Sequence, residues 1–178
     1  MKEINLNGQA KIKLNAKGLK RVEELVTRAS NTDTMSDYGK SVVIRDIRES
    51  IDEEGYLTNS LNHIMDDYDV DCFETSELTM QDVDSHEWFD LSLKDEVTVK
   101  LNGEGVKRTL RRVSEIERND RLSDEDKKRM VDEIESGIDD NNNLTASLEY
   151  IINNYSCSCL ENQIAKVSDE PVVTQGSK

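Results

Sequence analysis

The sequence predicts an α+β fold that arose by tandem duplication of one module. Residues 99–108 repeat residues 12–21, and with the same offset of 87 positions residues 3–74 align with residues 90–161 without an insertion or deletion. Of these 72 aligned positions, 23 are identical. In each copy apolar residues first alternate with polar ones, as in strands, and then recur every three or four positions, as in helices.

The duplication divides the chain into four segments. We expect a first module at residues 1–74, an acidic linker at 75–89, a second module at 90–161 and a flexible tail at 162–178. A module of this size is near the lower limit for an independent hydrophobic core. The two halves are therefore expected to pack against each other or against copies of themselves.

Each module is predicted to open with a β-hairpin. In the first copy the dipeptide Asn7-Gly8, a strong hairpin turn signal, separates two runs of alternating apolar residues. In the second copy Lys94-Asp95 stands at the turn. The alternating apolar residues are Ile4, Leu6, Ala10, Ile12 and Leu14, and then Leu91, Leu93, Val97, Val99 and Leu101.

A first helix is predicted to follow Asn15 in one copy and Asn102 in the other, because asparagine is a favoured N-cap residue. Gly18 and Gly105 lie in the first turn of these helices. Glycine destabilises a helix, so its presence in both copies indicates close packing or an irregular start. The apolar stripes are Leu19, Val22, Val26 and Ala29, and then Val106, Thr109, Val113 and Ile116.

Two further helices and a short closing strand are predicted in each copy. Ser123 opens a capping-box-like sequence before the second helix, whose stripes are Val43, Ile47 and Ile51, and then Met130, Ile134 and Ile138. The third helix is predicted from the stripes Leu57, Leu61, Ile64 and Tyr68, and then Leu144, Leu148, Ile151 and Tyr155. A closing strand is expected to bury the shared Cys72 and Cys159 as small apolar residues.

Composition excludes several functional classes. The net charge of −15 argues against direct binding to nucleic acid or to an anionic membrane. The chain has no apolar run long enough for a bilayer and no signal segment, and three cysteines without framework spacing fit a reducing compartment. We therefore expect a soluble, cytoplasmic protein.

No motif predicts catalytic residues, a cofactor or a bound metal. His63 aligns with Tyr150 and His86 lies in the predicted linker, so neither belongs to a repeated site. Around Gly55 the positions of Asp52 and Glu54 resemble part of a calcium loop, but the first and last ligand positions are Ser50 and Leu61. A calcium-responsive module therefore remains a minor alternative.

The acidic charge is concentrated in one segment. Residues 49–93 contain 14 acidic residues and no lysine or arginine. Four of these acids are replaced by Asn153, Asn154, Ser156 and Ser158 in the second copy, so the fold does not require them. The predicted partner-binding residues are Asp52, Glu53, Glu54, Asp66, Asp67, Asp69, Asp71, Glu74, Glu77, Asp82, Asp84, Glu87 and the aromatic Trp88. The alternative is a solvated acidic face without a partner.

Basic residues cluster on the predicted first helices. They are Lys17, Lys20, Arg21 and Arg28 in one copy and Lys107, Arg108, Arg111 and Arg112 in the other. Pairing with neighbouring acids is one explanation for these clusters. Contact with the acidic segment of a second chain, as in a homodimer, is another.

In size, acidity and lack of catalytic motifs the chain resembles the small, acidic, duplicated proteins that phages and mobile elements use against host defences, including anti-CRISPR and anti-restriction inhibitors. This resemblance implies a protein that occupies the basic channel of a nucleic-acid-binding enzyme. The main hypothesis is therefore a non-enzymatic interaction protein that binds a basic protein surface, with its carboxylates imitating nucleic-acid phosphates. A self-assembling structural or regulatory module is the alternative.

Overall fold

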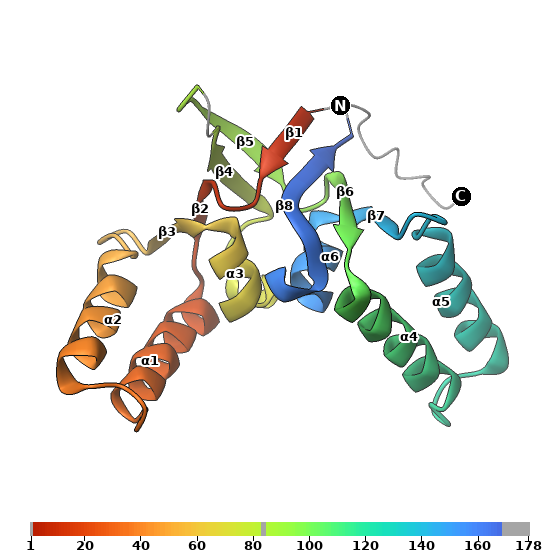
Figure 1. Cartoon of the computed structure of the whole chain (residues 1–178), viewed down its shortest axis with the longest axis horizontal. Coiled ribbons are helices and arrows are strands. Elements are labelled where there is room, and N and C mark those ends of the chain that lie inside the picture. The colour runs from red at the N-terminus through yellow and green to blue at the C-terminus, as the bar shows by residue number, and fades with distance from the viewer. Residues whose placement is uncertain (1, 83–84, 169–178) are drawn as a thin grey trace. The chain divides into compact units, whose positions relative to one another are not determined.

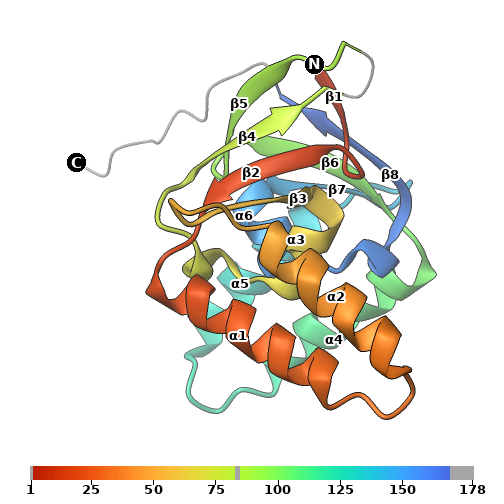
Figure 2. The same cartoon turned by 90° about the vertical axis from the view of Figure 1, so that its left-hand side faces the viewer.

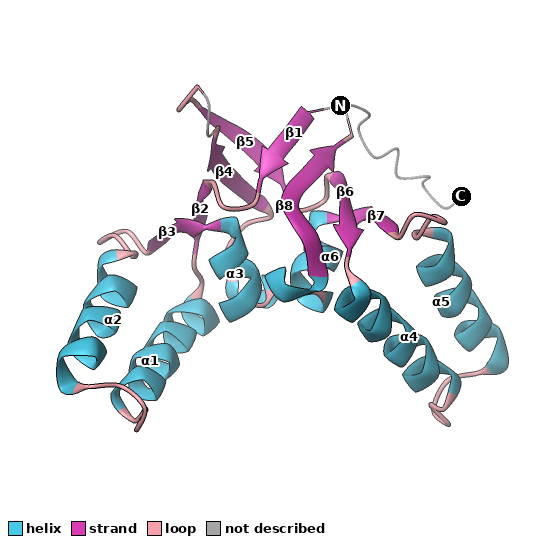
Figure 3. Cartoon of the chain, viewed as in Figure 1, coloured by secondary structure: helices cyan, strands magenta, loops and turns pink. Residues whose placement is uncertain are grey.

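A computed structural model describes residues 2–82 and 85–168 of the chain. It contains helices and antiparallel strands (Figure 3), which confirms the predicted α+β class. The chain forms two compact units. We call residues 7–93 the contiguous unit, and we call residues 1–6 together with residues 94 onward the split unit.

The two units contain equivalent elements (Figure 1). The contiguous unit consists of β2 (Gln9–Lys13), α1 (Ala16–Ser30), α2 (Asp37–Glu49), β3 (Tyr56–Ser60), α3 (Leu61–Asp67), the 3-10 turn η1 (Val70–Cys72), β4 (Glu77–Gln81) and β5 (Trp88–Ser92). The split unit consists of β1 (Lys2–Asn5), β6 (Glu96–Leu101), α4 (Gly103–Glu117), α5 (Asp124–Ser136), β7 (Asn143–Ser147), α6 (Leu148–Asn154), the 3-10 turn η2 (Cys157–Cys159) and β8 (Leu160–Val167).

Each unit has a four-stranded antiparallel sheet, ordered β3-β2-β4-β5 in the contiguous unit and β7-β6-β8-β1 in the split unit. The registers are equivalent: Leu91 pairs with Leu78 in one sheet, and Ile4 pairs with Ala165 in the other. The first strand of each sequence repeat therefore completes the sheet built mainly by the other repeat. We call this arrangement strand exchange.

The predicted opening hairpins are wrong for this reason. β1 does not pair with β2, and β5 does not pair with β6, although all four strands lie where the alternation places them. Strand β2 is already flanked by β3 and β4, and β6 by β7 and β8. Since a strand has only two hydrogen-bonding edges, neither has an edge left for its sequence neighbour.

The helices of the contiguous unit lie on one side of its sheet. In Figure 2, α3 lies between the sheet strands and the α1–α2 pair. Buried residues of α1 are Gly18, Val22, Leu25, Val26 and Ala29, whereas Leu19, placed in the predicted stripe, is 45% exposed. No residue of α2 is fully buried. Helix α2 packs on α1, so it covers the core only partly.

The third helix is shorter than predicted. Residues 56–60 form β3 and residues 143–147 form β7, so Leu57 and Leu144 are buried strand residues. Helices α3 and α6 begin only after Ser60 and Ser147, whose hydroxyls accept hydrogen bonds from the amides of His63 and Tyr150. Residues 56–60 pair with β2 as a strand, and the serine cap favours a helix start only after them.

The segments after the third helices also differ from prediction. Cys72 and Cys159 are buried, as predicted, but they lie in the 3-10 turns instead of in strands. The predicted linker at 75–89 contains β4 and the first residues of β5, and the predicted tail at 162–178 begins inside β8. The rest of that tail, from residue 169, lies outside the described residues. Both segments supply strands, since β4 pairs with β2 and β8 pairs with β6.

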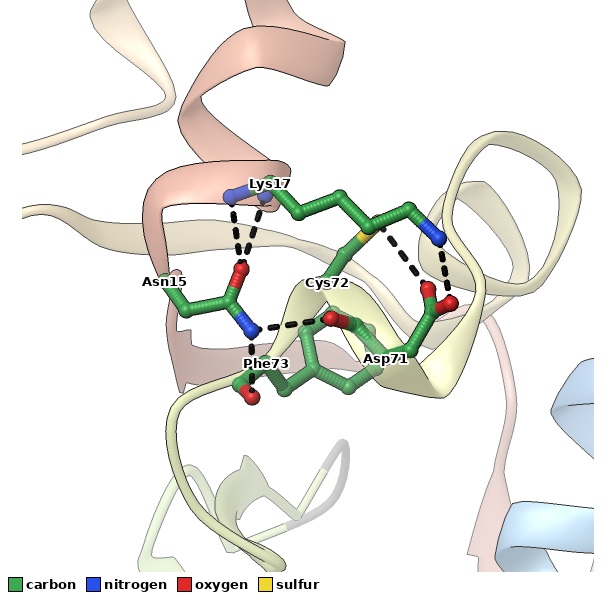
Figure 4. Close-up of polar contacts among 6 residues, drawn as sticks. Asn15, Lys17, Asp71, Cys72 and Phe73 are labelled. Carbon is green, nitrogen blue, oxygen red and sulfur yellow. Dashed lines mark hydrogen bonds and ion pairs between the residues drawn. The ribbon is translucent and has the colours of Figure 1, made fainter.

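Asn15 joins the start of α1 to η1 (Figure 4). Its side-chain oxygen accepts hydrogen bonds from the amides of Lys17 and Gly18, which confirms it as the N-cap. Its side-chain nitrogen donates to the carbonyl oxygens of Asp71 at 2.8 Å and Phe73 at 2.9 Å. Asn102 makes the equivalent four bonds in the split unit.

Exchanging Asn15 for alanine is expected to lower the free energy of unfolding by about 2 kcal/mol, since it removes the cap and both donor bonds. Asn15→Asp keeps the acceptor oxygen but loses the two donors. We expect Asn15→Asp to be destabilised as well, because a carboxylate would then face two carbonyl oxygens. Urea unfolding measures both variants, and wild-type stability of Asn15→Asp would show that the donor bonds contribute nothing.

Candidate partner-binding surface

The predicted acidic residues that the structure describes all belong to the contiguous unit, where they occupy three regions. Asp52, Glu53 and Glu54 form the turn between α2 and β3. Asp66 and Asp67 belong to α3, Asp71 belongs to η1, and Asp69 lies between these two elements. Glu74 follows η1, and Glu77 is the first residue of β4. Asp82 and Glu87 flank the β4–β5 turn, and Asp84 lies outside the described residues.

Asp52 builds its turn. One carboxylate oxygen accepts hydrogen bonds from the amides of Glu54 and Tyr56, and the other lies 3.1 Å from the Lys11 ammonium. The hydrogen bond from the Tyr56 amide is the main reason that the pKa of Asp52 is lowered. Asp139 makes the equivalent turn in the split unit, and its pKa is also lowered, chiefly by the Asn143 side chain. Because both copies use an aspartate to form this turn, a structural role accounts for the presence of Asp52.

The carboxylate of Asp52 is thus engaged by the protein itself in the turn that resembled a calcium loop. Among residues 2–82 and 85–168, no cluster of three or more histidine, cysteine or acidic side chains has a metal-binding arrangement. The three cysteines of the chain are not disulfide-bonded.

Two acids near α3 are partly neutralised by α1. Asp71 forms an ion pair with Lys17, and this hydrogen bond is the main cause of the raised pKa of Lys17. Asp67 lies 3.9 Å from Arg28 and its backbone carbonyl accepts a hydrogen bond from Arg21. The basic cluster of the first helix therefore contacts neighbouring acids of the same unit, as one of the two explanations predicted.

Exposed acids remain in this region. Asp66 and Asp69 are exposed, and so are Glu74 and Glu77. We define the α3–η1 acids as Asp66, Asp67, Asp69 and Asp71, which lie within six consecutive residues. They are a larger group than the three acids of the turn at residues 52–54.

The split unit has the same backbone at the equivalent segment without the charge. The Cys72 amide donates to the Asp69 carbonyl at 2.9 Å, and the Cys159 amide donates to the Ser156 carbonyl at 2.9 Å. At the ends of α3 and α6, the Tyr68 amide likewise donates a hydrogen bond to the Ile64 carbonyl, and the Tyr155 amide donates to the Ile151 carbonyl. Because uncharged residues form the same turn, the α3–η1 acids are not required by the fold.

The sheet surface of the contiguous unit carries mixed charge. A hollow of about 480 Å³ is lined by Glu74, Glu77 and Asp90 together with two lysines. The ammonium groups of Lys11 and Lys13 each lie 4.7 Å from the centroid of the Tyr56 ring. The lysines lower the net charge of this surface, so it is a weaker candidate for binding a cationic partner than the α3–η1 acids.

Trp88 begins β5 beside the β4–β5 turn and is 46% exposed. The turn is closed by a hydrogen bond from the Asp82 amide to the Glu87 carbonyl at 2.8 Å. Gln81, the β4 residue that pairs with Trp88, lies four residue steps from Glu77, or about 13 Å at the usual rise of a strand. The structure therefore does not merge all the predicted residues into one patch.

A groove between the helices was not predicted. It has a volume of about 580 Å³ and is lined by residues of α1, α2, β3 and α3, among them His63 and Asp67. The mismatch of His63 with Tyr150 in the alignment was the available signal. A single mismatch does not reveal a groove, however, because the walls of the groove come from four separate elements that meet only in the folded chain.

Comparison with protein-family models, curated proteins and solved structures found no match to this chain. Within the described residues, no helix is both long enough and apolar enough to cross a membrane.

Proposed function

We propose that this chain is a non-enzymatic interaction protein whose α3–η1 acids bind a basic surface of another protein. The observation that carries the proposal is the contrast between the two units. The same backbone carries Asp66, Asp67, Asp69 and Asp71 in the contiguous unit and only asparagine and serine in the split unit. Since the fold does not need these charges, binding is the simplest role for them.

The charge of the units agrees with this role. Residues 7–93 contain 19 acidic and 9 basic residues, whereas the rest of the chain contains 19 acidic and 14 basic residues. Complementary charge speeds association and selects partners. A partner that normally binds nucleic acid has the matching basic surface, and occupying that surface would inhibit it.

Neutralising the α3–η1 acids is expected to weaken partner binding by at least about 4-fold and by up to about 10³-fold, since four exposed ion pairs at about 0.2–1 kcal/mol each sum to about 0.8–4 kcal/mol. The variant Asp66→Asn, Asp67→Asn, Asp69→Ser and Asp71→Ser installs the residues of the split unit, so the fold is expected to be retained. Binding is measured by capture from a nuclease-treated bacterial lysate, with elution at rising salt.

The matched control removes four exposed acids from the split unit: Glu117→Gln, Asp120→Asn, Asp132→Asn and Glu135→Gln. It changes the net charge by the same amount. We expect the control to capture the same salt-eluted protein as the wild type, and that protein to lose nucleic-acid binding when the wild-type chain is added. Equal capture by the wild type and the α3–η1 variant would contradict the proposal.

A further inference from the structure

The groove of the contiguous unit has a smaller counterpart in the split unit. Each groove lies where the two long helices meet the strand and the short helix that follow them. The volume is about 580 Å³ in the contiguous unit and about 240 Å³ in the split unit. The two units thus carry the same site in an open and in a filled form.

At three aligned positions of the groove lining the split unit has the larger side chain. Ala29, Val43 and His63 line the open groove. The residues at the same positions of the split unit are Ile116, Met130 and Tyr150. The isoleucine, methionine and tyrosine are each larger than the residue they replace, so side chains of the split unit occupy space that stays open in the contiguous unit.

Tyr150 is the aromatic ring that fills the split unit's groove. Its ring lies 5.4 Å from the Arg112 guanidinium and 6.4 Å from the ring of Tyr155. Its hydroxyl is buried and makes no hydrogen bond within the described part of the chain. The site therefore accommodates a phenol ring mainly through apolar and cation–π contacts.

The open groove presents carboxylates beside its apolar floor. Leu25, Ala29 and Tyr68 are buried residues of that floor. Asp46 and Asp67 belong to the walls, and each has an arginine beside it, with Arg45 3.3 Å from Asp46 and Arg28 3.9 Å from Asp67. The lining carboxylates of Asp46 and Asp67 outnumber the one lining guanidinium, that of Arg28, and Asp67 is itself one of the α3–η1 acids.

We propose that the open groove binds an aromatic side chain of the partner, presented next to a lysine or arginine. The ring would take the place that Tyr150 fills in the split unit, and the cation would face Asp46 and Asp67. This inference rests on the proposed function for the identity of the partner. Aromatic residues that enter a pocket are frequent energetic anchors of interfaces, and the α3–η1 acids would surround such an anchor with complementary charge.

The first test uses small probes on the full chain and needs no partner. Tyramine carries a phenol ring and an ammonium group, p-cresol carries the ring alone, and 4-hydroxyphenylacetate carries the ring and a carboxylate. NMR titration is expected to give a Kd of about 1–10 mM for tyramine, typical of so small a ligand. Shifts should concentrate at Val43, Asn59 and His63, and 4-hydroxyphenylacetate should bind at least about 5-fold more weakly.

Two reciprocal variants locate the binding. Ala29→Ile with His63→Tyr installs the split unit's residues and should abolish the tyramine shifts. Ile116→Ala with Tyr150→His makes the opposite exchange and should add a second set of shifts around Thr145. The NMR spectrum itself reports whether each variant is folded. Absence of shifts in the folded wild type, or unchanged shifts in the folded Ala29→Ile, His63→Tyr variant, would overturn the proposal.

The second test links the groove to the partner. The Ala29→Ile, His63→Tyr variant keeps all four α3–η1 acids. The amount of salt-eluted protein that it captures is expected to be at least about 10-fold lower than for the wild type. If this variant captures as much partner as the wild type, while the variant with all four α3–η1 acids replaced captures none, the aromatic anchor is refuted and the proposed function stands. If no salt-eluted protein is captured by any form, the proposed function fails, and the tyramine titration alone decides whether the groove binds aromatic rings.

Discussion

Replacing Gly18 by alanine is expected to lower the free energy of unfolding by about 3 kcal/mol, the cost of forcing an extra atom into a packed site. A Cβ at this position would lie 2.3 Å from the carbonyl oxygen of Cys72. The same oxygen accepts a hydrogen bond from the Asn15 amide at 3.0 Å. Helix α1 and η1 therefore cannot separate without disturbing this bond. Urea unfolding followed by circular dichroism measures the effect.

The sign of this effect is the informative part. Glycine to alanine within a helix normally stabilises it by about 1 kcal/mol. Gly103, the first residue of α4, is the matched control, since a Cβ there would meet nothing within 4 Å. We expect Gly103→Ala to keep or slightly raise stability. Gly105→Ala should repeat the loss, because its Cβ would lie 2.4 Å from the Cys159 carbonyl oxygen. Equal stability of all three variants would contradict the close approach.

Leu6→Ala is expected to destabilise the split unit by about 2–5 kcal/mol, the usual range for a buried leucine. Leu6 is 1% exposed, and its amide donates to the Gln163 carbonyl at 2.7 Å. Although Leu6 belongs to the first sequence repeat, the loss should appear in β6 and β8. Hydrogen exchange measured by mass spectrometry locates it, with faster exchange expected there than in β2 and β4.

Leu93→Ala is the matched variant. Leu93 aligns with Leu6, is also 1% exposed, and its amide donates to the Ser76 carbonyl at 2.7 Å. Its substitution should accelerate exchange in β2 and β4 of the contiguous unit. If Leu6→Ala and Leu93→Ala accelerate exchange in the same strands, the strand exchange described above is incorrect.

The acidic residues of the candidate site could be predicted from the sequence, but their contacts could not. The alignment identified Asp66, Asp67, Asp69 and Asp71 as acids that the second copy lacks, and the structure gives both copies the same turn at this point. The alignment did not indicate that Asp71 pairs with Lys17. That pair joins residues 54 positions apart, and such contacts depend on how α1 packs on η1.

The sequence by itself determined the fold class, the duplication and the starts of the first helix in each copy. Alternation at Ile4 and Leu6, helical spacing along α1, and the caps Asn15 and Asn102 are local signals. Each acts within a few residues, and here each agrees with the global fold. Even the prediction that the paired glycines indicate close packing or an irregular start rested on a local cost, the instability of glycine in a helix.

Only the tertiary structure decided which strands pair and where the open groove lies. Alternation says that Ile4 and Leu6 belong to a strand but not which strand lies beside it. That choice follows from competition for the edges of β2 and β6, which are filled by strands from far along the chain. The open groove likewise depends on Ala29, Val43 and His63 meeting from three helices. Such contacts form only when distant segments pack together, and no local pattern encodes them.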